Sequence, residues 1–379
     1  MIIGRRRFVV GSLAAAAAAA CSSHEKRSTA MSETTPKPAP APPVKKSILV
    51  LGGTGFLGPH VVKAAVARGH TLTLFNRGKT HPGLFPDIEK LQGDRDGKLD
   101  ALKGRTWDAV VDPSGYVPRI VKLSAELLAP NVGQYVFIST ISVYKDPFPI
   151  GGDESAPVQT LDDPTNEDVG KNYGALKALS EKAAETAMPG KVTNVRSGLI
   201  IGPGDPTGRF THWPSRMADG GEVIGPGDGT TPAQYIDGRD LGEWIIHAIE
   251  NQTFGTYNAL GPGKPITMKA VLDRCNEAAG NKAKITWVDG KFLTAHEVSG
   301  WSDMPMWIDN TGEDAGFGTM ANARGVAAGM KFRPVLETAR DTLAWLETLP
   351  ADERAKVRST GIKPDKEAKV LAAWHAAKH

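Results

Sequence analysis

The 379-residue sequence predicts an α/β fold in which a doubly wound parallel sheet is joined to a smaller C-terminal lobe. Two observations indicate this class. First, a short aliphatic strand at residues 47–51 runs through a glycine-rich turn into an amphipathic helix. Second, strand-like and helix-like segments alternate to about residue 250, which is the order of βαβ units in a parallel sheet. The chain length fits one such domain with a smaller unit beside it.

The first strand, turn and helix have the pattern of a dinucleotide-binding unit. Residues 47–51 are mostly β-branched or aliphatic, as in a strand buried on both faces. Residues 60–68 show apolar side chains at helical spacing, and Gly69 closes the helix. Glycines between them let the backbone approach a pyrophosphate at the positive end of the helix. The predicted cofactor-binding residues of this turn are Gly52, Thr54, Gly55, Phe56, Leu57 and Gly58.

The end of the second strand, residues 71–75, bears on the choice of cofactor. An acidic residue there would accept hydrogen bonds from the adenosine ribose of NAD. The sequence instead has Asn76, Arg77 and Lys79, so two cations stand where the 2′-phosphate of NADP would lie. These residues favour NADP. The alternative is NAD, with Asn76 bound to the ribose and both cations solvated.

A distant motif, Tyr173-Gly174-Ala175-Leu176-Lys177, supplies groups for acid/base chemistry. Tyr173 and Lys177 are four residues apart, so they share one face of a helix. Hydride transfer between a carbinol carbon and a nicotinamide is coupled to proton transfer at the oxygen, which requires a positioned acid or base. A tyrosine titrates near roughly pH 10, and a nearby ammonium lowers its pKa by stabilising the phenolate. We therefore expect Tyr173 to transfer the proton and Lys177 to lower the pKa of Tyr173.

With these motifs in this order, the chain resembles the extended short-chain dehydrogenase/reductase superfamily, in the branch of NAD-dependent epimerases and dehydratases. The resemblance covers roughly residues 46–345, and the turn has the G-x-x-G-x-x-G spacing of this superfamily. Residues 139–144 resemble the family's S-S/T-x-x-V-Y segment at the end of a strand. This match selects Thr140 as the hydroxyl that holds the substrate oxygen.

The resemblance also implies further cofactor contacts. Residues 91–96 resemble the family's third strand end, where Asp94 and Arg95 would contact the adenine ring. The turn that contains Ser114 would pass beside the pyrophosphate and the nicotinamide ribose, and Lys177 would bind the same ribose. The implied activity is hydride transfer to or from a secondary alcohol or carbonyl, with NADP or NAD as cofactor.

Two structural regions are expected after the N-terminal segment. Residues 47–200 with 237–260 should form a Rossmann-type nucleotide-binding domain, and residues 201–236 with 261–379 should form a substrate lobe and C-terminal helices. Asp240 is predicted to cap the helix that follows the glycine- and proline-rich excursion. The later helices are predicted at about residues 241–250, 267–279, 335–348 and 364–377.

The N-terminal segment resembles an export signal. A cluster of three arginines precedes a short apolar run that ends at Ala20, and adjacent arginines are typical of twin-arginine signals. We expect residues 1–30 to hold this signal peptide and residues 31–46 to form a proline-rich, extended linker. The mature protein would be periplasmic or associated with the cell envelope.

Two residues leave alternatives for the cellular location open. Cys21 follows the alanine run at a position that resembles a lipoprotein cleavage site, where acylation would tether the protein to a membrane. The alternative is cleavage within the alanines. Translation from Met31 would instead give a cytoplasmic protein. The apolar run is shorter than the roughly 20 residues that a membrane span needs.

Composition limits the classes of site and partner. The two cysteines, Cys21 and Cys275, exclude a disulfide framework, and no clustered His/Cys spacing indicates a metal site. Loss of the three signal arginines leaves 42 basic and 42 acidic residues, so the mature chain is near neutral. We therefore expect a small-molecule substrate and no nucleic acid as partner.

Substrate contacts are expected in the glycine- and proline-rich excursion and in a later aromatic segment. The candidates are Arg209, His212 and Trp213, together with residues 301–307, whose aromatic rings can stack on a sugar or aromatic ring.

Three functions follow from these observations. The first is an NAD(P)-dependent oxidoreductase that uses Thr140, Tyr173 and Lys177 as catalytic residues. The second is an epimerase or lyase that retains its cofactor and returns the hydride within one cycle. The third is a non-catalytic module that binds a nucleotide or RNA. Dehydration is disfavoured, because Ile141-Ser142 stands where dehydratases carry an Asp-Glu pair.

Overall fold

The computed structural model describes residues 44–377. The predicted signal peptide at residues 1–30, with Cys21 inside it, therefore lies outside the described residues. Met31 and most of the predicted linker at residues 31–46 lie outside them as well.

A seven-stranded parallel sheet confirms the predicted α/β class. Its spatial order is β10-β6-β5-β4-β1-β2-β3, and every neighbouring pair is parallel. The strand order reverses between β1 and β4, so the loops after these two strands open the crevice in which such sheets bind ligands. The strands are β1 Ser47–Leu51, β2 Thr71–Asn76, β3 Glu89–Gln92, β4 Trp107–Asp112, β5 Val132–Thr140, β6 Val192–Ser197 and β10 Gly255–Ala259.

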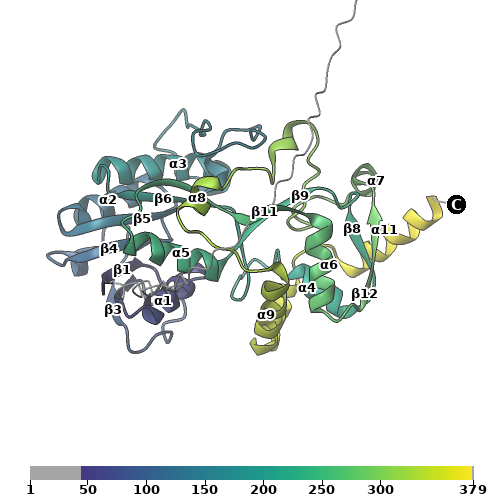
Figure 1. The fold of residues 1–379 in the computed structure, drawn as a ribbon, viewed down its shortest axis with the longest axis horizontal. Coiled ribbons are helices and arrows are strands. Elements are labelled where there is room, and N and C mark those ends of the chain that lie inside the picture. The colour runs from purple at the N-terminus through teal and green to yellow at the C-terminus, as the bar shows by residue number, and fades with distance from the viewer. Residues whose placement is uncertain (1–43, 378–379) are drawn as a thin grey trace, which may run out of the picture. The chain divides into compact units, whose positions relative to one another are not determined.

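Two pairs of helices cover the faces of this sheet (Figure 1). Helices α1 (Leu57–Ala67) and α5 (Gly238–Glu250) pack their apolar side chains on one face. Helices α2 (Pro118–Leu128) and α3 (Val169–Ala187) pack on the other. The central strands are buried on both sides, which explains their continuous apolar sequences.

The start of α5 differs from the prediction that Asp240 caps this helix. The Asp237 side chain occupies the cap and accepts a hydrogen bond from the backbone N–H of Arg239. Asp240 lies in the first turn and instead pairs with Arg333, whose Nε is 2.7 Å from its carboxylate. The reason is that β9 runs directly into α5, so the acidic residue at the strand end takes the capping position.

The second lobe contains two small sheets. Strands β7 (Leu199–Ile201), β9 (Pro232–Asp237) and β11 (Gly261–Thr267) form one, and β8 (Gly221–Pro226) pairs in parallel with β12 (Ala283–Val288). A separate hydrophobic cluster holds this lobe together. Its predicted helices are present as α6 Met268–Ala278, α9 Val335–Thr348 and α11 Pro364–Ala377, and the further helices are α4 His212–Asp219, α7 Gly290–Ala295, α8 Ala323–Ala327 and α10 Ala351–Arg358.

Within residues 44–377, no helix combines the length and the apolar character needed to cross a membrane.

Candidate active site

The glycine turn after β1 forms an open cradle at the N-terminus of α1. Gly52 and Gly53 have φ angles of 128° and 89°, which glycine adopts without strain. A Cβ on Gly58 would come within 2.5 Å of the Gly53 backbone, so the first turn of α1 packs closely on the loop. A Cβ on Gly55, by contrast, would meet open space. No side chain caps the free N–H groups of α1, and these groups can receive the pyrophosphate of a dinucleotide.

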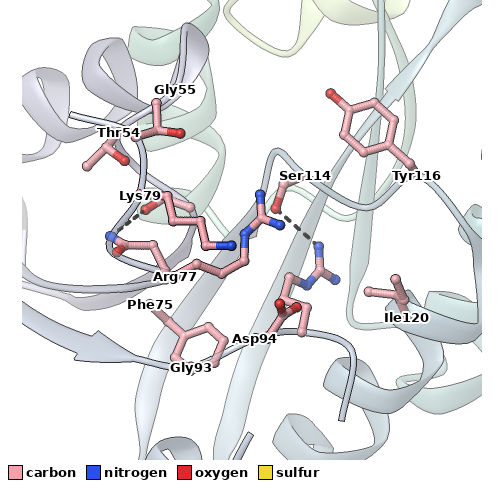
Figure 2. Close-up of a pocket in the computed structure, with 14 residues that line it drawn as sticks. Thr54, Gly55, Phe75, Arg77, Lys79, Gly93, Asp94, Ser114, Tyr116 and Ile120 are labelled. Atoms are coloured by element: carbon pink, nitrogen blue, oxygen red, sulfur yellow. Dashed lines mark hydrogen bonds between the residues drawn. The ribbon is translucent and has the colours of Figure 1, made fainter. Parts of the chain in front are cut away.

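A cavity of about 360 Å³ extends from this turn across the carboxyl ends of β1 to β4. In Figure 2, the side chains of Arg77 and Lys79 reach into it from the loop after β2. The Asn76 side chain is occupied by the turn itself, since its amide oxygen accepts a hydrogen bond of 2.8 Å from the Gly78 N–H. Nine of the predicted cofactor-binding residues line the cavity, namely Gly52, Thr54, Gly55, Asn76, Arg77, Lys79, Asp94, Arg95 and Ser114.

The other three residues predicted at the turn, Phe56, Leu57 and Gly58, do not line this cavity. They begin α1, where their backbone rather than their side chains would face a phosphate. The prediction missed Phe75, Thr80, Gly93, Tyr116 and Ile120, which complete the lining. Most of them lie at strand ends or in the loops that follow. Their place in the cavity follows from the strand order of the sheet and not from a sequence motif.

Arg95 lies in a buried ion-pair network under the cavity. Its guanidinium donates hydrogen bonds of 2.5 and 2.6 Å to the carboxylate of Asp112, which also accepts one of 2.7 Å from the Tyr135 hydroxyl. The same guanidinium lies 3.3 Å from the Ser114 hydroxyl, and Ser114 in turn donates to the carbonyl of Leu51. Arg95 thus lines the cavity while its charge is neutralised by Asp112, and it fixes the position of Ser114.

Tyr173 is placed by an unusually close approach of α3 to the end of β5. A Cβ on Gly174 would clash with the carbonyl oxygen of Ser142, in the short 3₁₀ turn Ile141–Val143 after β5. The backbone of α3 is non-helical at Asn172, so Tyr173 begins the regular part of the helix. These features bring Tyr173 beside Thr140, the last residue of β5.

The pKa of Tyr173 differs from the expectation. Burial raises the pKa of Tyr173 above its ordinary value, although the Thr140 hydroxyl and the charge of Arg209 act to lower it. The expected lowering by Lys177 is not found. The physical reason is where the lysine points: its Nζ donates hydrogen bonds of 2.6 Å to the carbonyl oxygens of Gly115 and Ile138.

Lys177 is nevertheless close to the site. It lies beneath the rings of Phe137 and Tyr116, with its Nζ 4.1 and 5.6 Å from their centroids. Only 3% of the residue is exposed, and this burial lowers the pKa of Lys177 to about 7. The carbonyl of Gly115 belongs to the loop that contains Ser114, so Lys177 connects α3 to the cofactor cavity.

The predicted substrate contacts separate into two groups. His212, Trp213 and Trp307 are buried, and their ring nitrogens bind Thr360, Pro305 and Thr231 respectively. They belong to the core of the second lobe, so their assignment as substrate contacts is wrong. Arg209 and Trp301 are only partly buried and stack on each other. Among the described residues, no three metal-ligating side chains come together.

The comparisons with known proteins agree with this geometry. Residues 115–259, which contain Thr140, Tyr173 and Lys177, match the model of the NAD dependent epimerase/dehydratase family. Similar curated proteins include 2-alkyl-3-oxoalkanoate reductase of Stenotrophomonas maltophilia, 26% identical over 62% of this chain and 76% of its own length. UDP-glucose 4-epimerase of Halalkalibacterium halodurans is 28% identical over 62% of this chain and 81% of its own.

The chain is similar to NAD-dependent enzymes of the extended short-chain dehydrogenase/reductase type. Its fold is similar to that of the Bordetella bronchiseptica enzyme WbmH in complex with NAD⁺, with a TM-score of 0.58, 17% identity, and coverage of 80% of this chain and 99% of the other. UDP-glucose 4-epimerase of Thermotoga maritima gives a TM-score of 0.57 at 17% identity, over 79% and 98% of the two chains.

One similar protein is named for a different property. The chloroplast stem-loop binding protein of 41 kDa b from Arabidopsis thaliana is 26% identical over 62% of this chain, and the match spans 64% of its length. The observations that a dinucleotide fits this chain are the open space at Gly55, the uncapped start of α1 and the cations of the cavity. Gly52, Thr54, Gly55 and Ser114 would hold its phosphates and ribose, and Lys177 would hold the second ribose.

Proposed function

We propose that the enzyme reduces a carbonyl compound to a secondary alcohol with NADPH. The observation that carries this proposal is the Tyr173 hydroxyl, placed beside Thr140, with a pKa that burial raises rather than lowers. A protonated phenol is a proton donor, and reduction of a carbonyl requires a donor at the oxygen.

The roles of the chain's own residues follow from this placement. When bound, NADPH would supply a hydride to the carbonyl carbon. The Thr140 hydroxyl orients the carbonyl oxygen, and Tyr173 gives its proton to that oxygen as the C=O π bond becomes a C–O single bond. The Tyr173 phenolate then takes a proton from water. Arg209 and the Thr140 hydroxyl stabilise this phenolate, since both lower the pKa of Tyr173.

NADP is the proposed cofactor because Arg77 and Lys79 reach into the cavity while no carboxylate follows β2. Arginine suits a phosphate because its planar fork can form paired hydrogen bonds. NAD is the alternative, and it is the nucleotide named with several structures of similar fold.

The proposal is tested by the oxidation of NADPH, followed at 340 nm, with a panel of ketones and oxo acids. Turnover that Tyr173→Phe abolishes would support it, with release of one alcohol for each NADPH consumed. An enzyme that oxidises no NADPH with any member, and converts none of the corresponding alcohols with NADP⁺, would contradict it.

An epimerase that returns the hydride to its own substrate is the second candidate. The named activities of several similar proteins favour it. Such an enzyme would be purified with one tightly held nucleotide per chain, which mass spectrometry after denaturation would detect. The reductase would bind NADPH reversibly.

A non-catalytic module that binds RNA is the third candidate, and the name of the chloroplast protein is the observation in its favour. In that case Tyr173→Phe would leave function unchanged. Export through the predicted signal peptide, and a membrane tether at Cys21, remain proposals that fractionation of the cell would test.

A further inference from the structure

Arg209 lies in a firmly seated loop between β7 and α4. The preceding residue, Gly208, has a φ of 68°, and a Cβ there would clash with the carbonyl oxygen of Val357 at the end of α10. Only glycine therefore allows the loop to contact α10 in this way. The backbone of Arg209 is held at this position by packing of the second lobe.

The side chain of Arg209 is fixed at one end and open at the other. Its Nε donates a hydrogen bond of 3.1 Å to the Thr207 hydroxyl, which itself donates one of 2.7 Å to the buried carboxylate of Asp205. The same carboxylate also accepts the Thr207 N–H. In the part of the chain that the structure describes, no carboxylate lies within ion-pair distance of Arg209, and its two terminal nitrogens have no protein hydrogen-bond partner. The guanidinium thus keeps two donor groups free.

Trp301 supports the guanidinium from one side. Its ring lies 5.4 Å from the guanidinium carbon, and Phe317 packs edge-on against it at 5.6 Å. The backbone of Trp301 is left-handed, with a φ of 64°, which is a genuine outlier for a bulky residue. Its N–H is held by the carbonyls of Trp307 and Met304, at 2.8 and 3.1 Å. Strain that the surrounding structure maintains in this way is characteristic of ligand sites.

The charge of Arg209 acts on the catalytic tyrosine. Burial raises the pKa of Tyr173, and within residues 44–377 the cation that acts to lower it is Arg209. Tyr173 in turn acts to raise the pKa of Arg209, although burial lowers it overall. This mutual effect indicates that the two side chains lie near each other.

We infer that Arg209, supported by Trp301, binds a carboxylate of the substrate, which makes the substrate an oxo acid or the matching hydroxy acid. This inference rests on the proposed function, because it takes the carbonyl at Tyr173 as the reacting group. A free guanidinium fork matches the two oxygens of a carboxylate. A phosphate dianion fits less well, since the carboxylate of Asp205 lies behind Arg209, on the far side of the Thr207 hydroxyl.

The test uses three oxo acids in which the carbonyl and carboxylate are increasingly far apart, namely pyruvate, acetoacetate and levulinate, each beside its methyl ester. Turnover is measured as oxidation of NADPH by the full-length protein. Binding is measured by calorimetry with the Tyr173→Phe protein saturated with NADPH, so that no reaction occurs. The variants are Arg209→Met and Arg209→Lys, and Arg324→Met is the matched control. Arg324 is an exposed arginine that stacks on Tyr257, 4.7 Å from its ring and outside this site.

At least one acid should bind or react about 10- to 100-fold better than its ester, the range expected for a charge-assisted pair of hydrogen bonds. Arg209→Met should reduce this ratio to near one. Arg209→Lys should give an intermediate value, because it keeps the charge but loses the fork. Arg324→Met should leave the ratio unchanged. Melting temperature and the Kd for NADPH establish that each variant is folded, and Trp301→Leu, with a smaller expected loss, replaces Arg209→Met if that variant is not.

Two results would overturn the inference: a ratio that Arg209→Met leaves unchanged, or no binding by any of the three acids. Its failure is distinguishable from failure of the proposed function. Reduction of the keto group in the methyl esters and in neutral ketones, without dependence on Arg209, would support the reductase and contradict the carboxylate site. Arg209-dependent binding of an acid without oxidation of NADPH would support the carboxylate site and contradict the reductase.

Discussion

Gly174 lies in direct backbone contact with Ser142, and a Cβ atom at position 174 would clash with the carbonyl oxygen of Ser142. This contact joins the helix that carries Tyr173 and Lys177 to the strand end that carries Thr140. The distance between the hydroxyls of Tyr173 and Thr140 is therefore set by two backbones rather than by side-chain packing.

Gly174→Ala is expected to destabilise the enzyme and to reduce turnover. Alanine is favoured over glycine in a helix by roughly 1 kcal/mol, but the clash forces a backbone shift that costs about 1–3 kcal/mol. The shift also separates Tyr173 from Thr140. Urea denaturation and steady-state kinetics measure the two effects. Gly170→Ala is the control, because a Cβ there meets only the end of the Asp168 side chain at 3.3 Å. Equal turnover in the two variants would show that the contact does not position Tyr173.

Tyr173→Phe is expected to reduce kcat by about 10²–10⁴-fold, because the positioned proton donor is lost. The Kd for NADPH should change little, since Tyr173 does not line the cofactor cavity. Stopped-flow absorbance and fluorescence titration measure these quantities. Tyr257→Phe removes a hydroxyl that binds the carbonyl of Phe254 and serves as control. Full activity in Tyr173→Phe would exclude Tyr173 as the acid.

Arg77→Ala and Lys79→Ala are each expected to weaken NADPH binding about 10-fold, which corresponds to roughly 1.4 kcal/mol. Binding of NADH should stay the same, because it carries no 2′-phosphate. Calorimetry with both nucleotides gives the ratio of affinities. Lys103→Ala removes an exposed lysine that pairs with Asp100 and should affect neither nucleotide. Equal losses for NADPH and NADH would mean that these cations hold the pyrophosphate or adenine instead.

Lys177→Met is expected to change how stability depends on pH. Burial lowers the pKa of Lys177 to about 7 in the folded enzyme, below the ordinary value near 10.4. Between these values the unfolded state binds more protons, so the contribution of Lys177 to stability rises with pH and is constant below about pH 7. The stability advantage of Lys177→Met should therefore shrink by about 3 kcal/mol from pH 7 to pH 9.5.

Urea denaturation across this pH range measures the difference between Lys177→Met and the parent enzyme. Lys171→Met is the control on the same helix, because the Lys171 side chain is 84% exposed. A difference that does not change with pH would show that Lys177 is charged in the folded enzyme throughout.

The sequence predicts the larger domain well because its signals are local. Aliphatic runs such as residues 47–51 predict buried strands, and the glycine turn predicts its own conformation and the cavity beside it. The helices of the second lobe are also found, since α9 and α11 lie within a residue of their predicted ends. Each of these signals depends only on the residues of a single strand, turn or helix.

The parts that sequence does not predict depend on contacts between distant residues. Strand β11 contains two prolines and is largely exposed, so it has neither the composition nor the alternation of a strand. The pairing of Arg95 with Asp112 joins the loop after β3 to the last residue of β4, and it changes the role expected of Arg95. The pKa of Tyr173 is set by burial and by Arg209, and neither is visible in a Y-x-x-x-K motif.

The separate hydrophobic clusters of the two lobes have a consequence for how this enzyme can diversify. Arg209 directly precedes Phe210, a buried member of the second lobe's cluster, whereas α3 is anchored in a cluster of the parallel sheet through Ala184. Mutations that remodel the loop around Arg209 and Trp301 therefore leave the scaffold of Tyr173 and Lys177 intact. A change of substrate contacts in this loop would therefore need no change in the helix that carries the proposed proton donor.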